Sequence, residues 1–275
     1  MVTPEPPSLE TAAPETRTAA GMAPDTAGPG TGTPGTRTPG TTTVPSTAAP
    51  RTTTSKATTP AGFTVVLDPG HNGGNASHPE VINQLVPAGR GRTKPCNTVG
   101  TSTDAGYAEH AFTWDVALRV RELLTARGVR VVLTRSSDTG VGPCVDERAA
   151  IGNAAAADAV VSIHADGAAA DARGFHVAYS SPPLNAAQGE PAHSLAAVVR
   201  DAMTGAGFPT ANYIGSGGLD GRDDLAGLNL SERPAVLVEC ANMRNPGEAA
   251  TVSSAAGRAR YAAAIAAGIL RWLGA

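Results

Sequence analysis

The chain has 275 residues, of which 41% are hydrophobic, 16% charged and 4% aromatic, and its formal net charge at neutral pH is −3. This composition excludes two classes of protein. No basic stripe is present to neutralise the phosphates of a nucleic acid, and no apolar run approaches the roughly 20 residues that cross a bilayer.

The first 60 residues differ sharply from the rest, because they contain 18 Thr and 11 Pro and no aromatic residue. A segment so poor in apolar surface cannot offset the entropy lost on ordering. We predict that residues 1–61 form a disordered Thr/Pro/Ala/Gly-rich tail and that residues 62–275 form one domain. The N-terminus lacks the basic and apolar regions of a signal peptide, although Thr/Pro-rich tethers are typical of exported, wall-associated proteins.

The folded part begins with a short apolar strand at 63–67, which the sequence Asp-Pro-Gly ends in a turn. A Gly/Pro/Thr-rich stretch from 72 to about 106 has no periodicity and is predicted to be a long functional loop. A helix follows from about 108 to 127 and ends at Gly128. Its apolar face, continued back by one turn, reaches Glu109.

The remaining segments alternate between the two kinds of element. Strands are predicted at 129–133, 159–163, 175–179 and 235–239, and helices at about 146–157, 194–206 and 258–273. Short, nearly uninterrupted apolar strands that alternate with helices favour a parallel sheet with both faces covered. We therefore predict an α/β domain with a mostly parallel, twisted sheet between helices.

Polar side chains follow the apolar runs of three predicted strands, at the positions of His71, His164 and Glu239. Ligands of open α/β sheets bind beyond the carboxyl ends of the strands, so we expect these side chains and Glu109 to meet at one edge. Two imidazoles and a carboxylate form a ligand set that suits catalytic zinc and leaves one position for water. The remaining carboxylate would then be the general base.

Each of these residues also has a structural explanation. A His after a strand more often makes only hydrogen bonds, and Glu109 could complement the helix dipole. Glu239 could pair with Arg135 or Arg148, and Asp68 could be a turn residue and nothing else. Each explanation is the commoner one for a single residue, but the convergence of four such groups on one sheet edge favours a metal site.

Four segments identify a known family. VVLDPGHNGG, AEHAFTWDVALRVRELL, VVSIHAD and AVLVECANMRN resemble, in order and context, the signature blocks of the zinc-dependent N-acetylmuramoyl-L-alanine amidases of the Amidase_3 type. The resemblance covers about residues 63–272. Further segments, such as GPCVDERAAIGNA and GFHVAYSSPPLN, are similar to the stand-alone mycobacterial and actinobacterial branch of that family.

The resemblance implies a peptidoglycan hydrolase that cleaves the amide between the lactyl group of N-acetylmuramic acid and L-Ala of the stem peptide. It implies one Zn²⁺ per domain, with His71, Glu109 and His164 as metal ligands. Glu239 matches the catalytic carboxylate, which would act as the base for a zinc-activated water.

Other positions concern the substrate. Arg222 and Asn229 resemble family positions near the cleft, and we predict that they contact the substrate, with a solvated loop as the alternative. The chain departs from the family pattern at Asp166, where Asn is usual, and at Cys240 after the catalytic Glu. Neither difference affects a ligand position, so both bear on the details of substrate recognition.

The three cysteines are predicted to divide into one pair and one free thiol. Cys96 and Cys144 lie in loops, and an exported protein favours their pairing in a disulfide that would hold the long loop beside the cleft. Cys240 follows a buried strand and is expected to stay reduced, because no His–Cys pair supports the alternative role of nucleophile.

Four further histidines are expected to have no role in the reaction. His110 is predicted to lie at the surface or beside the ligands, because it points away from Glu109 on a helix. His78, His176 and His193 are predicted to be structural.

The resemblance also implies the partners and the location of the protein. We expect peptidoglycan and muropeptides as partners, a secreted or otherwise extracytoplasmic protein, and a monomer. Two alternative functions remain at this point. A zinc peptidase or carboxypeptidase acting on the stem peptide would use the same ligands and base. A wall-binding module that has lost catalysis would not need the intact ligand set.

Overall fold

The computed structural model describes residues 62–275, so the tail predicted for residues 1–61 lies outside the described residues. The strands of the main sheet are β1 (Thr64–Pro69), β4 (Arg130–Leu133), β5 (Ala159–Asp166), β6 (His176–Ser180), β7 (Leu219–Arg222) and β8 (Ala235–Asn242). The longer helices are α2 (Glu109–Thr125), α3 (Val145–Ala154), α4 (Glu190–Gly205), α6 (Pro246–Ser253) and α7 (Ala255–Leu273), with a short α5 at Ala226–Asn229.

The sheet has the strand order β4-β1-β5-β8-β6-β7 within the described part of the chain. Strands β4, β1, β5 and β8 are parallel to one another. Strand β6 is antiparallel to β8, and β7 is parallel to β6, so these two strands run the opposite way. The predicted α/β class with a mostly parallel sheet is confirmed.

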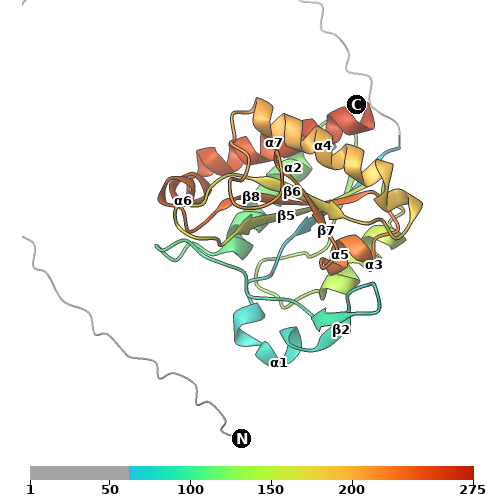
Figure 1. The fold of residues 1–275 in the computed structure, drawn as a ribbon, viewed down its shortest axis with the longest axis horizontal. Coiled ribbons are helices and arrows are strands. Elements are labelled where there is room, and N and C mark those ends of the chain that lie inside the picture. The colour runs from blue at the N-terminus through green and yellow to red at the C-terminus, as the bar shows by residue number, and fades with distance from the viewer. Residues whose placement is uncertain (1–61) are drawn as a thin grey trace, which may run out of the picture. The chain divides into compact units, whose positions relative to one another are not determined.

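Helices cover both faces of the sheet (Figure 1). On one face α2, α4 and α7 pack against the larger core cluster, which includes Phe112, Leu195, Ile265 and alternate residues of the strands. On the other face α3 and α5 cover a smaller cluster that includes Val66 and Val160. The strands are apolar on both sides, and this is why they read as nearly continuous hydrophobic runs. None of the helices in residues 62–275 is long and apolar enough to cross a membrane.

The stretch from 72 to 106, predicted as a loop, contains short elements of its own. They are a 3-10 turn (Asn75–Ser77), α1 (Pro79–Ile82) and the antiparallel hairpin β2 (Leu85–Pro87) and β3 (Thr93–Pro95). These elements are three or four residues long, too short to leave a periodic pattern in the sequence. In Figure 1, α1 and β2 lie on the side of the sheet opposite α4 and α7.

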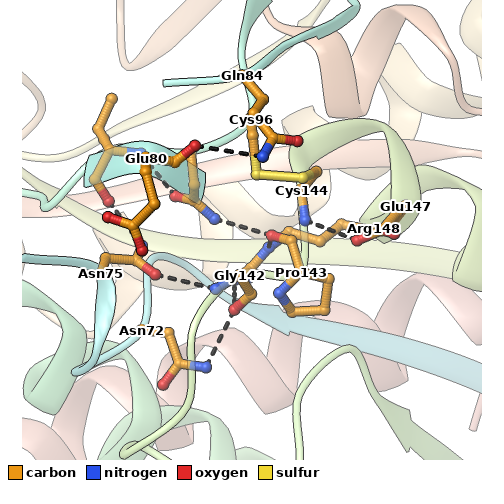
Figure 2. Close-up of a disulfide and its surroundings, with 12 residues drawn as sticks. Asn72, Asn75, Glu80, Gln84, Cys96, Gly142, Pro143, Cys144, Glu147 and Arg148 are labelled. Carbon is orange, nitrogen blue, oxygen red and sulfur yellow. Dashed lines mark hydrogen bonds between the residues drawn. A yellow bond between two sulfur atoms is a disulfide. The ribbon is translucent and has the colours of Figure 1, made fainter. Parts of the chain in front are cut away.

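A disulfide between Cys96 and Cys144 joins this stretch to the segment before α3, with an S–S distance of 2.13 Å. This is the pairing predicted from the sequence. Figure 2 shows that hydrogen bonds accompany it: the side chain of Asn75 accepts from the Gly142 N–H at 2.9 Å, and the side chain of Asn72 donates to the Gly142 carbonyl at 3.0 Å. The stretch is thus tied covalently and by hydrogen bonds to the body of the domain.

Candidate active site

The side chains predicted as ligands lie together at the carboxyl ends of β1 and β5 and the start of α2. One ligand atom each from His71, Glu109 and His164 lies within 4.8 Å of the others. Glu109 stands between the imidazoles, with Oε2 at 3.1 Å from His71 Nε2 and Oε1 at 2.9 Å from His164 Nδ1. The convergence predicted for these three residues is therefore present in the structure.

The donor set fits a divalent ion of the zinc type. His71 Nδ1 lies 3.0 Å from the backbone oxygen of Thr98, which can only accept a hydrogen bond. Nδ1 therefore carries a proton, and Nε2 is the ring nitrogen that faces Glu109 and can bind a metal. Histidines that bind metals usually donate their second N–H in this way. Two imidazole nitrogens and a carboxylate oxygen are ligands that suit zinc.

Two glycines allow this close packing. A Cβ at Gly70 would overlap the ring of His164, and a Cβ at Gly100 would lie 2.8 Å from Glu109 Oε2 and 2.9 Å from His71 Cδ2. Gly100 also has a φ of +86°, a conformation that side chains disfavour. Both positions require glycine if the chain is to pass this close to the ligand group.

His71 has a left-handed backbone with φ of 58°, which is uncommon for a residue with a side chain. Arg148 holds it there, because its guanidinium donates to the His71 carbonyl at 2.8 Å. The same guanidinium pairs with Asp68 at 2.6 Å. A backbone conformation of this kind costs about 1–3 kcal/mol. It is typical of functional sites, where the surrounding contacts hold the residue in place despite the cost.

Asp68 is a partly buried anchor and more than a turn residue. Its carboxylate accepts hydrogen bonds from the hydroxyls of Thr134 and Ser162, each at 2.6 Å, in addition to its ion pair. Burial by itself would raise the pKa of Asp68, but Arg148 and the two hydroxyls outweigh it and lower the pKa to about 2. The anchor therefore stays ionised and fixes the end of β1 to β4, β5 and α3.

The ligand group is electrostatically coupled. Burial alone would lower the pKa of His71 and raise that of Glu109, but their mutual attraction, with His164 also acting on Glu109, reverses both directions. The pKa of His71 is raised and that of Glu109 is lowered. A carboxylate that stays ionised between two imidazoles attracts positive charge. A metal cation can supply this charge when it displaces protons from the ligand side chains.

Glu239 lies on β8, directly opposite His164 of β5 in the strand register. It is partly exposed to the cavity, but its Oε2 atom is buried and has no hydrogen-bond partner among the described residues. Burial, and then the negative charges of Glu109 and Asp166, raise the pKa of Glu239 well above its ordinary value. The side chain is thus a carboxyl group with high proton affinity.

The alternative in which Glu239 pairs with an arginine is wrong. Arg148 is paired with Asp68 at 2.6 Å, and Arg135 is paired with Asp138 at 2.8 Å. No ion pair of Glu239 occurs among residues 62–275.

A cavity of about 470 Å³ connects these groups, within the size range of ligand pockets. Besides the ligand group and Glu239, its walls come from the sheet face, α3, α5 and the loop around residues 94–101. Most of these walls are apolar, including Val145, Val160, Leu228 and Leu237. Lys94 also lines the cavity, and it has no carboxylate partner among the described residues.

Arg222 and Asn229 do not line the cavity. Arg222 on β7 pairs with Asp220 and Asp224 at 3.3 and 2.7 Å. The buried amide of Asn229 is fully used within the protein: it donates to the carbonyls of Ala88 and Asp223 and accepts from Arg90 and Ser180. The geometry therefore gives no support to the substrate contacts predicted for these two residues.

The remaining residues of interest have structural surroundings. His110 pairs with Asp138 at 2.9 Å, beside the ligand group. Cys240 is free and buried, and burial raises the pKa of its thiol, which disfavours a nucleophilic thiolate.

Sequence reasoning missed the wall formed by α5 and the position of Lys94. Both lie in short segments without periodicity, so the sequence carries no strong signal for them.

The fold and the site together define a class: an α/β domain with a His/Glu/His group suited to a metal and a free glutamate on the same cavity. Comparison with known proteins identifies the family. The model of the N-acetylmuramoyl-L-alanine amidase family matches residues 65–271. The chain belongs to this family, as its motifs had indicated.

Individual relatives agree with this assignment. The chain is 53% identical over 213 residues to the N-acetylmuramoyl-L-alanine amidase Rv3717 of Mycobacterium tuberculosis, which covers 78% of this chain and 87% of that protein. The crystal structure of the N-acetylmuramyl-L-alanine amidase Ami1 from Mycobacterium smegmatis is 56% identical with a TM-score of 0.76, covering 78% of this chain and 98% of that one. The apo form of Ami1 from Mycobacterium abscessus is 55% identical with a TM-score of 0.75, covering 78% and 99%.

Proposed function

We propose that this chain is a zinc-dependent peptidoglycan amidase that cleaves the bond between the lactyl group of N-acetylmuramic acid and L-Ala of the stem peptide. Family membership and the names of the relatives support the substrate. The observation that carries the chemistry is Glu239, whose carboxyl oxygen has no partner and lies on the cavity that holds the His/Glu/His group.

The residues that would hold one Zn²⁺ are His71 through Nε2, Glu109 through a carboxylate oxygen and His164 through Nδ1. When bound there, zinc would polarise the lactyl carbonyl and lower the pKa of water towards about 7. The hydrogen bond from His71 Nδ1 to the Thr98 carbonyl supports this assignment, because it occupies Nδ1 and leaves Nε2 as the nitrogen that can bind the metal.

Glu239 is the group that moves the proton. Its carboxylate takes a proton from the water that attacks the lactyl carbonyl, and it delivers that proton to the nitrogen of L-Ala as the C–N bond breaks. The products are a lactyl carboxylate and the protonated amine of L-Ala, which takes up both protons of the water, so one water is consumed and no other reactant is required. The high proton affinity of this carboxyl favours the first of these transfers, from the water to Glu239.

The cavity indicates how the substrate is recognised. No Phe, Tyr or Trp occurs among the described residues that line it, so stacking of sugar rings is not the basis of binding. Its apolar walls suit the short side chains of a peptide. Lys94 offers a positive charge for a carboxylate, a group that stem peptides carry. We infer that the enzyme binds mainly the stem peptide and the scissile amide.

We further propose that residues 62–275 are the catalytic domain and that it acts outside the cytoplasm as a monomer. The disulfide supports this location, since disulfides persist in oxidising compartments. The substrate, peptidoglycan, lies in the same place. The stretch 1–61 would serve as a tether to the wall.

A direct test is the digestion of purified peptidoglycan with the full chain, with and without EDTA, followed by mass spectrometry. The amidase releases intact stem peptides with a free N-terminal L-Ala, EDTA abolishes the release, and added Zn²⁺ restores it. Stem peptides shortened at their carboxyl end would instead indicate the peptidase alternative, and the absence of any product would indicate a binding module.

A further inference from the structure

His176 lies beside the catalytic glutamate. It is the first residue of β6 and pairs in register with Glu239 of β8, and His164 of β5 pairs with Glu239 from the other side. Residues opposite each other on neighbouring strands direct their side chains to the same face of the sheet. The three residues therefore form a row across three strands, with Glu239 in the middle.

Two atoms of this row are buried without hydrogen-bond partners. They are Glu239 Oε2 and His176 Nδ1, and within residues 62–275 only Asp146 Oδ1 shares this property. His176 is only 2% exposed. An unpaired buried polar atom costs about 1–3 kcal/mol. Two such atoms on directly opposite residues, one of which lines the cavity, therefore call for a functional explanation.

The surroundings of His176 favour one position for the proton of its neutral ring. Nε2 faces Asp220, whose Oδ2 lies 4.0 Å away. The ring stands edge-on to Tyr213, whose hydroxyl donates to Asp166 at 3.0 Å. Burial lowers the pKa of His176, so the imidazole is neutral. With the proton on Nε2 towards the carboxylate of Asp220, Nδ1 is left as a hydrogen-bond acceptor.

We propose that His176 is a positioning residue whose Nδ1 accepts a hydrogen bond from the carboxyl group of Glu239 while that group carries the proton in transit. The proposal rests on the proposed function. No bond to His176 is made or broken. The O–H of Glu239 exchanges its bond to Nδ1 for one to the leaving nitrogen of L-Ala when the proton is delivered. Directly opposite Cβ atoms are about 4.5–5.5 Å apart, so a side-chain rotation or one bridging water connects the two atoms.

This role differs from that of a metal ligand or a substrate contact. His176 does not line the cavity and does not belong to the His/Glu/His group. Its loss should therefore lower kcat, because the protonated state of Glu239 loses its partner, while KM and zinc content stay the same. A merely structural His would affect the stability of the fold without this selectivity.

The test compares three substitutions in the full chain. His176→Leu removes the acceptor and keeps the volume. His176→Asn places an amide oxygen where Nδ1 was, and His176→Gln places its amide further out, where Nε2 was. His193→Leu is the control, because His193 is exposed. For each variant we would measure kcat and KM on a soluble muropeptide, zinc per chain, and the urea midpoint.

We expect His176→Leu to lose about 10- to 100-fold in kcat, with KM and zinc content within about twofold of wild type. His176→Asn should recover most of kcat, and His176→Gln should not. Wild-type kcat in the Leu variant, or better recovery by Gln than by Asn, overturns the proposal. If His176→Leu does not fold, the comparison of Asn with Gln decides alone.

A metal-free measurement gives an independent answer. In EDTA, the shifts in urea midpoint caused by His176→Leu and Glu239→Ala, which remove the acceptor and the donor, should be non-additive in the double variant, because the two side chains interact. Additive shifts count against the interaction. If wild-type enzyme releases no stem peptides at all, the proposed amidase function fails, whereas wild-type activity with an unaffected Leu variant refutes only the role of His176.

Discussion

Asp68 and Glu239 are carboxylates on the same face of one sheet, on β1 and β8, yet their surroundings are opposite. Asp68 has a guanidinium and two hydroxyls packed against it, and its pKa falls to about 2. Glu239 has no cation in contact, one unpartnered oxygen, and a raised pKa. Neighbouring groups thus make one carboxylate an inert anchor and leave the other reactive.

The ligand group lies between these two carboxylates, since β5 stands between β1 and β8. The Asp68 side holds the chain around His71 in place, and in the proposed mechanism the Glu239 side performs proton transfer. Substitutions on the two sides should therefore separate stability from catalysis.

The largest effect is expected for the ligand group itself. His71→Ala and His164→Ala should each reduce activity to background, because two ligands hold a metal far more weakly than three. Elemental analysis of the purified variants should find much less than one zinc per chain. His193→Ala is the control and should keep both zinc and activity. A His164→Ala variant with full zinc content would refute the assigned site.

On the reactive side, Glu239→Gln should lower kcat about 1,000-fold and leave zinc content unchanged. The urea midpoint should stay the same or rise, because the substitution removes a carboxyl group that has no partner. Steady-state kinetics, elemental analysis and urea unfolding on the same preparation check all three outcomes. Near wild-type turnover would contradict the role of Glu239 as the base.

On the anchored side, replacing both Cys96 and Cys144 with Ser should destabilise the fold by about 2–4 kcal/mol. The bond closes a loop of 48 residues. Zinc affinity should also fall, because Thr98, which holds His71 Nδ1, lies two residues after Cys96. Urea unfolding with and without a reducing agent measures the effect. Reductant should destabilise the wild type and leave the double variant unchanged.

The anchor itself should make stability depend on pH. The folded-state pKa of Asp68, about 2, lies below the ordinary value of 3.8 for an aspartate. Ionised Asp68 therefore adds about 2 kcal/mol to the free energy of unfolding. This contribution is complete above about pH 5 and disappears as the pH falls towards about 2. Asp68→Asn should remove this part of the curve in urea unfolding at several pH values. Asp223→Asn, at an exposed ion pair, should leave the curve unchanged.

The smallest effect is expected at Lys94. Lys94→Gln should raise KM by about threefold to fivefold with little change in kcat, because a partly exposed ion pair contributes at most about 1 kcal/mol. Kinetics should be measured on muropeptides whose carboxylates are either free or amidated. The rise in KM should appear only with the free carboxylates. Arg92→Gln, on the same hairpin but outside the cavity, is the control.

Local patterns were enough to predict most of the fold. The apolar runs of β1, β4, β5, β6 and β8 and the helical periodicity of α2 and α7 are signals within one element, and these elements are present with small shifts of their ends. Strand β7 was missed because Leu-Asp-Gly-Arg has no apolar alternation, and it lies at the edge of the sheet. The hairpin and α5 are too short for any period to appear.

The candidate active site could be predicted from the sequence because its residues follow the apolar runs that mark the strands. His71, His164 and Glu239 follow apolar runs, and Glu109 continues a helical face, so the sequence alone determined that these groups meet at one edge of an α/β sheet. The family motifs then indicated which of them bind zinc. These inferences hold because alternation and strand ends are properties of contiguous residues.

Only the tertiary structure decided what each carboxylate does. Arg148, 80 residues from Asp68, is the partner that makes Asp68 an anchor and leaves Glu239 without a cation. His176, predicted to be structural, lies opposite Glu239 only because β6 runs antiparallel to β8. Charge pairing and strand register join residues that are distant along the chain, and proton affinity depends on such neighbours, so the sequence by itself leaves these roles undetermined.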